Sequence, residues 1–394
     1  MLEQEKKELY CSLSALCVFR DILDTPPLQT LCAYLRADGD VAEQVKLFGA
    51  FVHSLAPYDF DFSAFLRRAV YGNENPYVTG MAQNRSVSPA VEENARAELR
   101  LFSKLTALHT EDLCASLRYD GYLPAFDNTP VNFEAEYEDR LHDIGRFGYG
   151  IFASAGMFRV EDGQILPIHA ADPVTLDAFI GYADERKQVF DNTQALCDGR
   201  PAANMLLCGD AGTGKSSTVK ACANYFFAQG VRLIELRKDQ LFSLPAVMEK
   251  ITENPLKFIV FIDDLSFNQN DDQFSMLKAA LEGSASAKAK NAVIYATSNR
   301  RHIVKESFSD RESGDDVHRA DTIQELMSLS DRFGQVVYFE KPNKALYLQI
   351  IRSLAARYGI TMDPAELENK AEVFALSRGG RTPRAAEQFI NSLI

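Results

Sequence analysis

The 394-residue chain lacks several features that mark membrane, secreted and metal-binding proteins. No apolar run approaches the roughly 20 residues that span a bilayer, and the polar first residues do not resemble a signal peptide. The seven cysteines include no C-x-x-C pair, so neither a zinc site nor a disulfide framework is indicated. Acidic residues outnumber basic ones, 55 to 42, which gives a net charge of −13. This charge argues against broad, non-specific nucleic-acid binding, although a local basic patch is still possible. We therefore expect a cytoplasmic protein without a membrane segment.

Residues 1–145 are predicted to form a mostly α-helical N-terminal domain. Apolar side chains recur there at helical spacing, for example over 45–55 and 99–108. Ser88 followed by Pro89 is typical of a helix cap with proline at the first helical position. Apolar stripes of this kind more often form a helix-bundle core than a partner-binding groove. No catalytic group stands out in this domain, and we expect it to contact an unknown protein client.

A glycine-rich segment, 146–171, separates this domain from the rest of the chain. Two short apolar runs, 158–160 and 165–168, flank the turn residues 161–163. This pattern predicts a β-hairpin. We interpret the segment as a connector.

Strands alternate with helices over residues 172–342, and helices alone follow over 343–394. The predicted strands are 204–208, 231–236, 258–262, 292–297 and 335–339. The predicted final helices are 343–358, 364–377 and 383–393. Alternation of this kind is typical of an α/β fold with crossover helices, here with a five-stranded parallel sheet.

Residues 209–216 read Gly-Asp-Ala-Gly-Thr-Gly-Lys-Ser and match the phosphate-binding loop pattern G-x-x-x-x-G-K-[ST] in full. An apolar strand precedes the loop and a predicted helix, 217–228, follows it, which is the arrangement that the motif requires. Backbone N–H groups and the helix N-terminus would hold phosphate oxygens. Lys215 is predicted to reach the β- and γ-phosphates of ATP and Ser216 to hold Mg²⁺. The candidate nucleotide-binding residues are Gly209, Asp210, Ala211, Gly212, Thr213, Gly214, Lys215, Ser216 and Ser217.

Two later strands end in polar residues that suit nucleotide hydrolysis. The apolar strand 258–262 delivers Asp263, a candidate Mg²⁺ ligand, and Asp264, a candidate to orient or deprotonate the attacking water. The strand 292–297 is followed closely by Asn299. If this strand lies between the other two, Asn299 lies beside the γ-phosphate and can position the water.

These elements together resemble the AAA+ ATPase superfamily, with a Walker A loop, a Walker B pair, Asn299 as sensor 1 and a C-terminal helical lid. The texts GRPAANMLLCGDAGTGKSS, YATSNRRH and SLSDRFG are similar to a narrower group, the bacterial DUF815 family of predicted ATP-binding proteins. The resemblance covers roughly residues 172–394. It implies a P-loop AAA+ core at 172–342 and a lid at 343–394.

The resemblance also implies roles for three arginines and one adenine-bordering segment. Arg332 would be a finger that reaches the γ-phosphate of a neighbouring subunit, which implies a homo-oligomer; Arg311 is the alternative. Arg384, in the first turn of the last helix, would be the sensor 2 contact with phosphate; Arg381 is the alternative. The candidate adenine contacts are Ile180 and Gly181.

The leading hypothesis is an AAA+ ATPase that hydrolyses ATP to ADP and phosphate and drives conformational change or assembly on an unknown client. Many AAA+ proteins have Asp-Glu where this chain has Asp263-Asp264, which puts the turnover rate in question. One alternative is therefore a nucleotide-gated binding module with negligible hydrolysis. Another is a DNA-associated helicase loader or initiator, prompted by the Asp-Asp pair and the basic Arg300-Arg301; the acidic net charge disfavours it.

Overall fold

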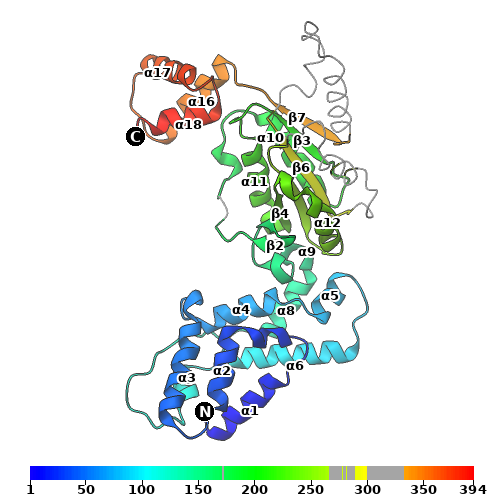
Figure 1. Ribbon diagram of the computed structural model, residues 1–394, viewed down its shortest axis with the longest axis vertical. Coiled ribbons are helices and arrows are strands. Elements are labelled where there is room, and N and C mark those ends of the chain that lie inside the picture. Colours follow the sequence, from blue (N-terminus) through cyan, green and yellow to red (C-terminus); the bar gives the residue numbers. More distant parts are fainter. Residues whose placement is uncertain (171–172, 266–276, 278–280, 282–288, 300–331) are drawn as a thin grey trace. The chain divides into compact units, whose positions relative to one another are not determined.

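The computed structural model describes residues 1–170, 173–265, 277, 281, 289–299 and 332–394. The chain divides into two compact units, Met1–Ser154 and Ala155–Ile394 (Figure 1). In the described parts of both units, no helix combines the length and apolar character needed to cross a membrane.

The first unit is all-helical, as its apolar stripes predict. Ser88 caps the longest of its described helices: its Oγ accepts a hydrogen bond from the backbone N–H of Val91, and Pro89 takes the first helical position. The α-helices are α1 (Glu3–Ser14), α2 (Pro26–Arg36), α3 (Val41–Ser54), α4 (Phe62–Gly72), α5 (Pro76–Ala82), α6 (Pro89–Leu105), α7 (Thr110–Cys114), α8 (Phe133–His142) and α9 (Ile144–Phe147). Short 3-10 helices occur at Arg20–Asp24, Ala56–Tyr58 and Gly150–Ala153.

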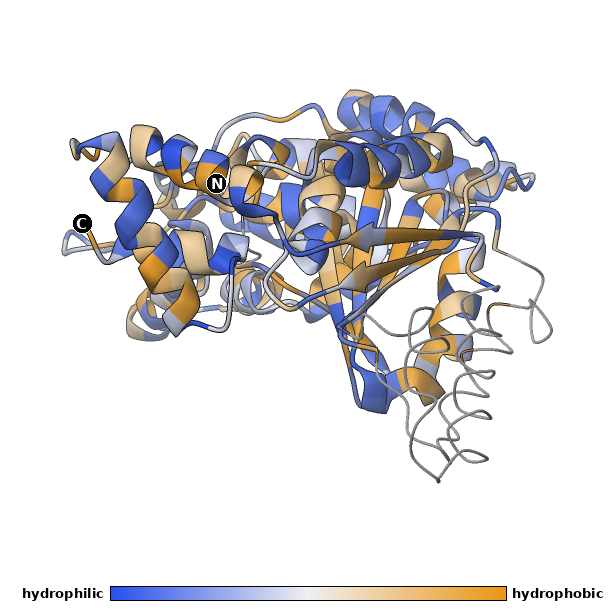
Figure 2. Cartoon of the chain, turned by 90° about the horizontal axis from the view of Figure 1, so that it is seen from above, coloured by the Kyte–Doolittle hydropathy of each residue, from blue (hydrophilic) through white to orange (hydrophobic). Residues whose placement is uncertain are grey.

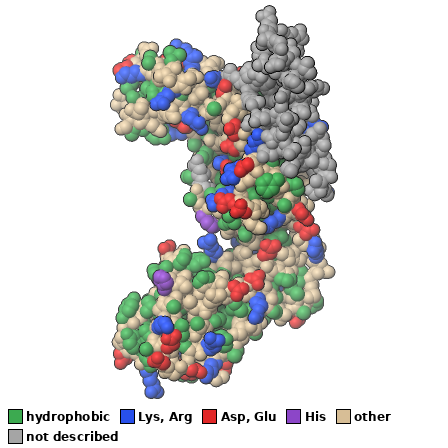
Figure 3. All heavy atoms as spheres, viewed as in Figure 1, with side chains coloured by type: hydrophobic (Ala, Val, Ile, Leu, Met, Phe, Trp, Pro, Cys, Tyr) green, Lys and Arg blue, Asp and Glu red, His purple; other side chains and the backbone are tan. Residues whose placement is uncertain are grey.

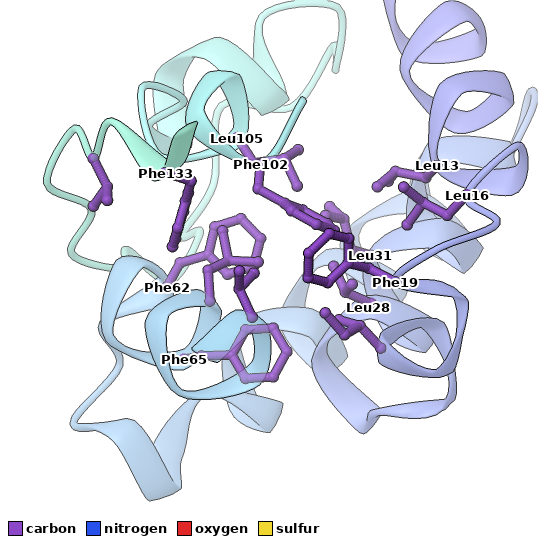
Figure 4. Close-up of a cluster of buried hydrophobic side chains, with 14 of the residues drawn as sticks. Leu13, Leu16, Phe19, Leu28, Leu31, Phe62, Phe65, Phe102, Leu105 and Phe133 are labelled. Atoms are coloured by element: carbon purple, nitrogen blue, oxygen red, sulfur yellow. The ribbon is translucent and has the colours of Figure 1, made fainter. Parts of the chain in front are cut away.

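Leucine and phenylalanine side chains make up most of the core of this unit (Figure 4). The rings of Phe19 and Phe102 meet edge to face with their centroids 5.6 Å apart, and Phe62 and Phe65 stack at 6.0 Å. Edge-to-face and offset arrangements of this kind stabilise a core beyond the burial of the rings themselves. The apolar stripes of these helices therefore form a core. On the face of this unit seen in Figure 3, basic, acidic and hydrophobic side chains are interspersed.

The second unit is built on one seven-stranded sheet with the order β2-β1-β4-β5-β6-β3-β7. Its strands are β1 (Met157–Glu161), β2 (Gln164–Pro167), β3 (Met205–Gly209), β4 (Val231–Leu236), β5 (Lys257–Ile262), β6 (Ala292–Ser298) and β7 (Gln335–Phe339). All neighbouring pairs are parallel except β1 and β2. The strands are strongly hydrophobic (Figure 2), as expected where both faces of a parallel sheet are covered.

All five strands expected of the parallel sheet are present, and the hairpin extends the same sheet by two more. Phe158 of β1 pairs with Ile234 of β4. The hairpin that we interpreted as a connector is therefore also part of the core. β6 lies between β3 and β5, which is the order that the expectation for Asn299 requires.

Helices cover the sheet and form the lid. In the core these are α10 (Ala183–Cys197), α11 (Lys215–Phe226) and α12 (Leu244–Thr252), with 3-10 turns at Leu176–Ala178, Phe227–Gln229 and Lys238–Ser243. The lid helices are α16 (Lys344–Arg357), α17 (Pro364–Ser377) and α18 (Pro383–Asn391), which agree with the predicted ranges to within a few residues. They enclose their own small core, in which Tyr347, Ile351, Ala371 and Ile390 are fully buried. Capping fixes each lid helix at its start, by Asn343, Asp363 and Thr382.

Candidate nucleotide-binding site

The loop between β3 and α11 has a backbone that only glycine accommodates at its first position. Gly209 has φ +147°, and a Cβ placed there would lie 2.1 Å from the carbonyl oxygen of Phe339 on β7. Gly212 has φ +76°, and its Cβ would lie 3.0 Å from the Cβ of Arg384 in the lid. The glycines of the motif therefore allow the loop to bend tightly and to pack closely against β7 and the lid.

Lys215 lies almost fully buried beneath this loop, at 5% exposure. Its Nζ donates to the carbonyl oxygens of Gly209 at 2.9 Å and Asp210 at 2.8 Å, and to Oδ1 of Asn299 at 2.9 Å. Burial lowers the pKa of this lysine, while the carboxylates of Asp210, Asp263 and Asp264 and the Cys208 thiol oppose the shift. The Lys215 ammonium is held by neutral oxygens in a site of low dielectric constant, where it attracts an anion more strongly than it would in water.

The two aspartates after β5 have different surroundings. Oδ1 of Asp263 accepts from Ser216 Oγ and from Thr297 Oγ1, each at 2.6 Å. The backbone N–H of Asp264 donates to Thr297 Oγ1 at 2.9 Å, and Asp264 has the left-handed φ of 53°. Thr297 thus fixes the direction in which both aspartates leave the strand. Sequence reasoning missed Thr297; the available signal was a hydroxyl near the end of an otherwise apolar strand.

Asn299 joins the buried lysine to the second aspartate. Its Nδ2 donates to Oδ1 of Asp264 at 2.7 Å while its Oδ1 accepts from Lys215. An amide between a cation and a carboxylate can satisfy both in only this orientation. The site is therefore one connected network from the phosphate loop to the acid that follows β5.

The residues predicted to bind a metal fit Mg²⁺. Ser216 and Asp263 offer a hydroxyl and a carboxylate oxygen 2.6 Å apart beside the loop. Among the described residues no cluster of three His, Cys, Asp or Glu side chains could hold a metal ion. Mg²⁺ usually takes one or two protein oxygens and completes its shell with water and phosphate oxygens.

The lid places Arg384, rather than Arg381, at the loop. The backbone N–H of Arg384 donates to the carbonyl of Gly212 at 3.3 Å. Arg381 instead forms a bidentate ion pair with Glu372 of α17, at 2.9 and 2.6 Å. Thr382 caps α18 by accepting from the N–H of Ala385 at 3.0 Å, so Arg384 lies in the first turn.

A cavity of about 180 Å³ lies between the loop, the segment before α10 and the lid. Ile180 lines it, whereas Gly181 does not; Gly181 packs against Leu346 of α16 instead. Arg186 also lines the cavity, and burial lowers its pKa. Arg357 of the lid donates to the carbonyl oxygen of Ala178 at 2.7 Å, which ties the lid to this segment. Neither arginine was expected from the sequence.

Arg332 lies in the turn before β7 and lines neither of the two cavities beside the loop. β7 runs parallel to β3, and Phe339 at its far end pairs with Gly209. A five-residue strand spans about 17 Å, so Arg332 lies at the edge of the sheet opposite to the phosphate loop. Arg311 lies outside the described residues, as does the Arg300-Arg301 pair.

Comparison with solved structures finds 420 matching chains. Among solved structures, a RuvB mutant from Thermotoga maritima matches with a TM-score of 0.37 and 17% identity, over 56% of this chain and 64% of that one. The match spans slightly less than two thirds of that chain. The Thermotoga maritima RuvB Holliday junction branch migration motor matches with a TM-score of 0.33 and 14% identity, over 56% of this chain and 72% of that one. No curated protein matches.

The second unit combines the P-loop sequence, a β5-β6-β3 strand order and a helical lid on one α/β core, which is the arrangement that the resemblance to AAA+ proteins implies. A family model described as "Protein of unknown function (DUF815)" matches residues 153–394. This match covers the hairpin, the sheet and the lid, and more than half of the chain. The chain therefore belongs to the DUF815 family.

Proposed function

We propose that the chain binds ATP with Mg²⁺ and hydrolyses it to ADP and phosphate, and that this drives conformational change or assembly on a protein client of residues 1–145. The observation that carries this proposal is the network Lys215–Asn299–Asp264 with Asp263 and Ser216 beside it. The seven cysteines form no disulfide, which supports a reducing compartment such as the cytoplasm.

In the proposed reaction, the γ-phosphate draws Lys215 away from Asn299. Asn299 and Asp264 then hold a water in line with the bond between the γ-phosphorus and the β,γ-bridging oxygen, and Asp264 receives its proton. The backbone of the loop and the N-terminus of α11 hold the phosphates. Mg²⁺, held by Ser216 and Asp263, would neutralise the charge that develops on the phosphate oxygens. Arg384 would contact the γ-phosphate from the lid.

We further propose that the active site is completed between subunits by Arg332. Within one chain this residue lies across the sheet from the loop, farther than an arginine side chain reaches. A role at phosphate therefore requires a neighbouring copy, and hence a homo-oligomer. ATP turnover per chain, measured with Mg²⁺ over a range of protein concentrations, tests this. A rate that rises with concentration, and loses that rise in Arg332→Ala, supports the shared site; a constant rate contradicts it.

The decisive variant for nucleotide binding is Lys215→Ala. We expect it to abolish ATP binding or hydrolysis, because no other described lysine donates to the loop carbonyls. Lys220→Ala is the matched control: Lys220 lies on the same helix but pairs with Glu235 at 3.1 Å. Unchanged ATP turnover in Lys215→Ala would remove the assignment.

A second candidate function is a nucleotide-gated module with negligible hydrolysis. The observation that favours it is the short Asp264 side chain, which is held back by Asn299 at 2.7 Å. ATP that binds but is not turned over at any protein concentration would favour this module. Measurable turnover that depends on Asp264 would exclude it.

A further inference from the structure

A second cavity, of about 350 Å³, lies between the start of the phosphate loop and the lid. The loop contributes Asp210 and Ala211, and the lid side contributes Lys341, Arg378 and Arg384. The first cavity is lined instead by Gly212, Thr213 and Gly214 of the loop. Arg384 lines both cavities and is the only residue that they share.

The second cavity carries an excess of positive charge. Lys341 donates only a long hydrogen bond, 3.4 Å, to the carbonyl of Gly379. The guanidinium of Arg378 lies over the ring of Phe374, 5.3 Å from its centroid. Among the described residues, Lys341 and Arg378 form no ion pair with a carboxylate. The carboxyl of Glu387, which lines the first cavity, interacts electrostatically with Arg384. Asp210 is the one acidic residue in the lining.

The backbone adds to this positive field. Helix α18 begins at Pro383, directly after its cap Thr382, which also lines the cavity. The backbone N–H groups of Arg384 and Ala385 already donate to the Gly212 carbonyl and to Thr382 Oγ1, so α18 contributes its dipole rather than these donors. Three cations from separate segments therefore converge with one helix N-terminus on a space beside the phosphate loop.

We propose that this cavity is a second phosphate site, which receives the inorganic phosphate produced at the loop. This inference rests on the proposed ATP hydrolysis. Inorganic phosphate at neutral pH is a mixture of monoanion and dianion with several acceptor oxygens, and guanidinium groups match it with paired hydrogen bonds. Arg384 borders both cavities and so contacts the phosphate before and after it leaves the loop. Lys341 and Arg378 hold it on the far side.

The first test is a calorimetric titration of inorganic phosphate into the full chain with the loop occupied by the β,γ-imido analogue of ATP. We expect one phosphate site in the wild type and at least a ten-fold loss of phosphate affinity in the double variant Lys341→Gln/Arg378→Gln, with the affinity for the analogue unchanged. Lys344→Gln is the matched control, since it removes a lid cation that does not line the cavity. Absence of phosphate binding in the analogue-loaded wild type, or equal binding in the double variant, overturns the inference.

Failure of the analogue itself to bind would contradict the proposed function rather than this inference. Phosphate is then titrated into Lys215→Ala, whose loop lacks its phosphate-binding lysine, to test the cavity directly. Phosphate binding that is lost when Lys341→Gln and Arg378→Gln are introduced into the same chain supports the inference. Absence of phosphate binding to Lys215→Ala overturns the inference. The source of the phosphate is tested by phosphate release in a single turnover. Faster release in the double variant supports product phosphate, whereas unchanged release overturns that role and assigns the site to a phosphoryl group on another ligand.

Discussion

Asn299 and Asp264, from neighbouring strands, are joined by a 2.7 Å hydrogen bond from the amide nitrogen to the carboxylate. The other end of the same amide accepts from Lys215. An anion that draws Lys215 toward itself therefore removes one of the two contacts that hold Asn299. We propose that the position of the acid after β5 depends in this way on the occupancy of the phosphate loop.

Asp264→Asn is expected to reduce ATP turnover by about 100-fold or more, the usual contribution of a general base. ATP affinity is expected to change less than about three-fold, because the Lys215 and Ser216 contacts stay in place. Steady-state hydrolysis and equilibrium ATP binding measure the two effects separately. Asp198→Asn, an exposed carboxylate bonded to Arg200, is the control. Turnover near the wild-type rate in Asp264→Asn would show that this carboxylate is not the base.

ATP affinity is expected to fall as the pH rises. The fall begins at a lower pH than it would if Lys215 had the ordinary lysine pKa of about 10.4. Burial lowers the pKa of Lys215 in the free protein, and bound phosphate raises it again, so binding takes up a proton between these two values. The folded, nucleotide-free chain binds fewer protons than the unfolded chain in the same window, so the free energy of unfolding rises with pH there.

The measurement is the ATP dissociation constant from about pH 7 to 10. Lys215→Arg is the comparison, because arginine keeps its charge over this range. Its affinity is expected to be weaker but flatter with pH. Parallel pH profiles for the wild type and Lys215→Arg would contradict a titrating Lys215.

The elements that sequence patterns predicted best are those whose signals are local. β4 and β7 begin and end at the predicted residues, because each is a short, mostly apolar run between polar turns. Pro383 and Thr382 marked the start of α18 in the same way. The phosphate loop was also predicted in full, because its motif lies within eight consecutive residues.

The features that could not be predicted depend on residues distant in sequence. The hairpin was visible, but its pairing with β4 was not, because strand pairing is decided by the whole sheet. Thr297 acquires its role only because β6 lies beside β5. Thr382 and Pro383 already favoured Arg384 over Arg381, but the ion pair that holds Arg381 to Glu372 of another helix could not be predicted.

Glu98→Gln is expected to destabilise the N-terminal unit by about 2 kcal/mol or more, the cost of leaving buried donors unpaired. The Glu98 carboxylate is 7% exposed and accepts from the backbone N–H groups of Cys17 at 2.7 Å, Val18 at 3.1 and 3.2 Å and Phe19 at 2.8 Å. A glutamine amide offers one acceptor oxygen in place of two. Hydrogen exchange of these three amides in the full chain measures the effect.

The control for this prediction is Glu93→Gln on the same helix, which removes an equal charge from an exposed position. It is expected to change stability by less than about 0.5 kcal/mol. Equal protection of residues 17–19 in wild type and Glu98→Gln would show that the carboxylate does not hold this turn.

Gly209→Ala is expected to destabilise the second unit by at least about 3 kcal/mol, because it combines backbone strain with a steric clash. The added Cβ would lie 2.1 Å from the carbonyl oxygen of Phe339, which is backbone of β7 and cannot move alone. Gly199→Ala is the matched control: Gly199 also has a positive φ, +67°, but a Cβ there meets nothing within 4 Å. Its cost is expected to be about 1 kcal/mol from φ alone. Thermal unfolding without nucleotide compares the two variants, and equal losses would mean that the loop and β7 move apart freely.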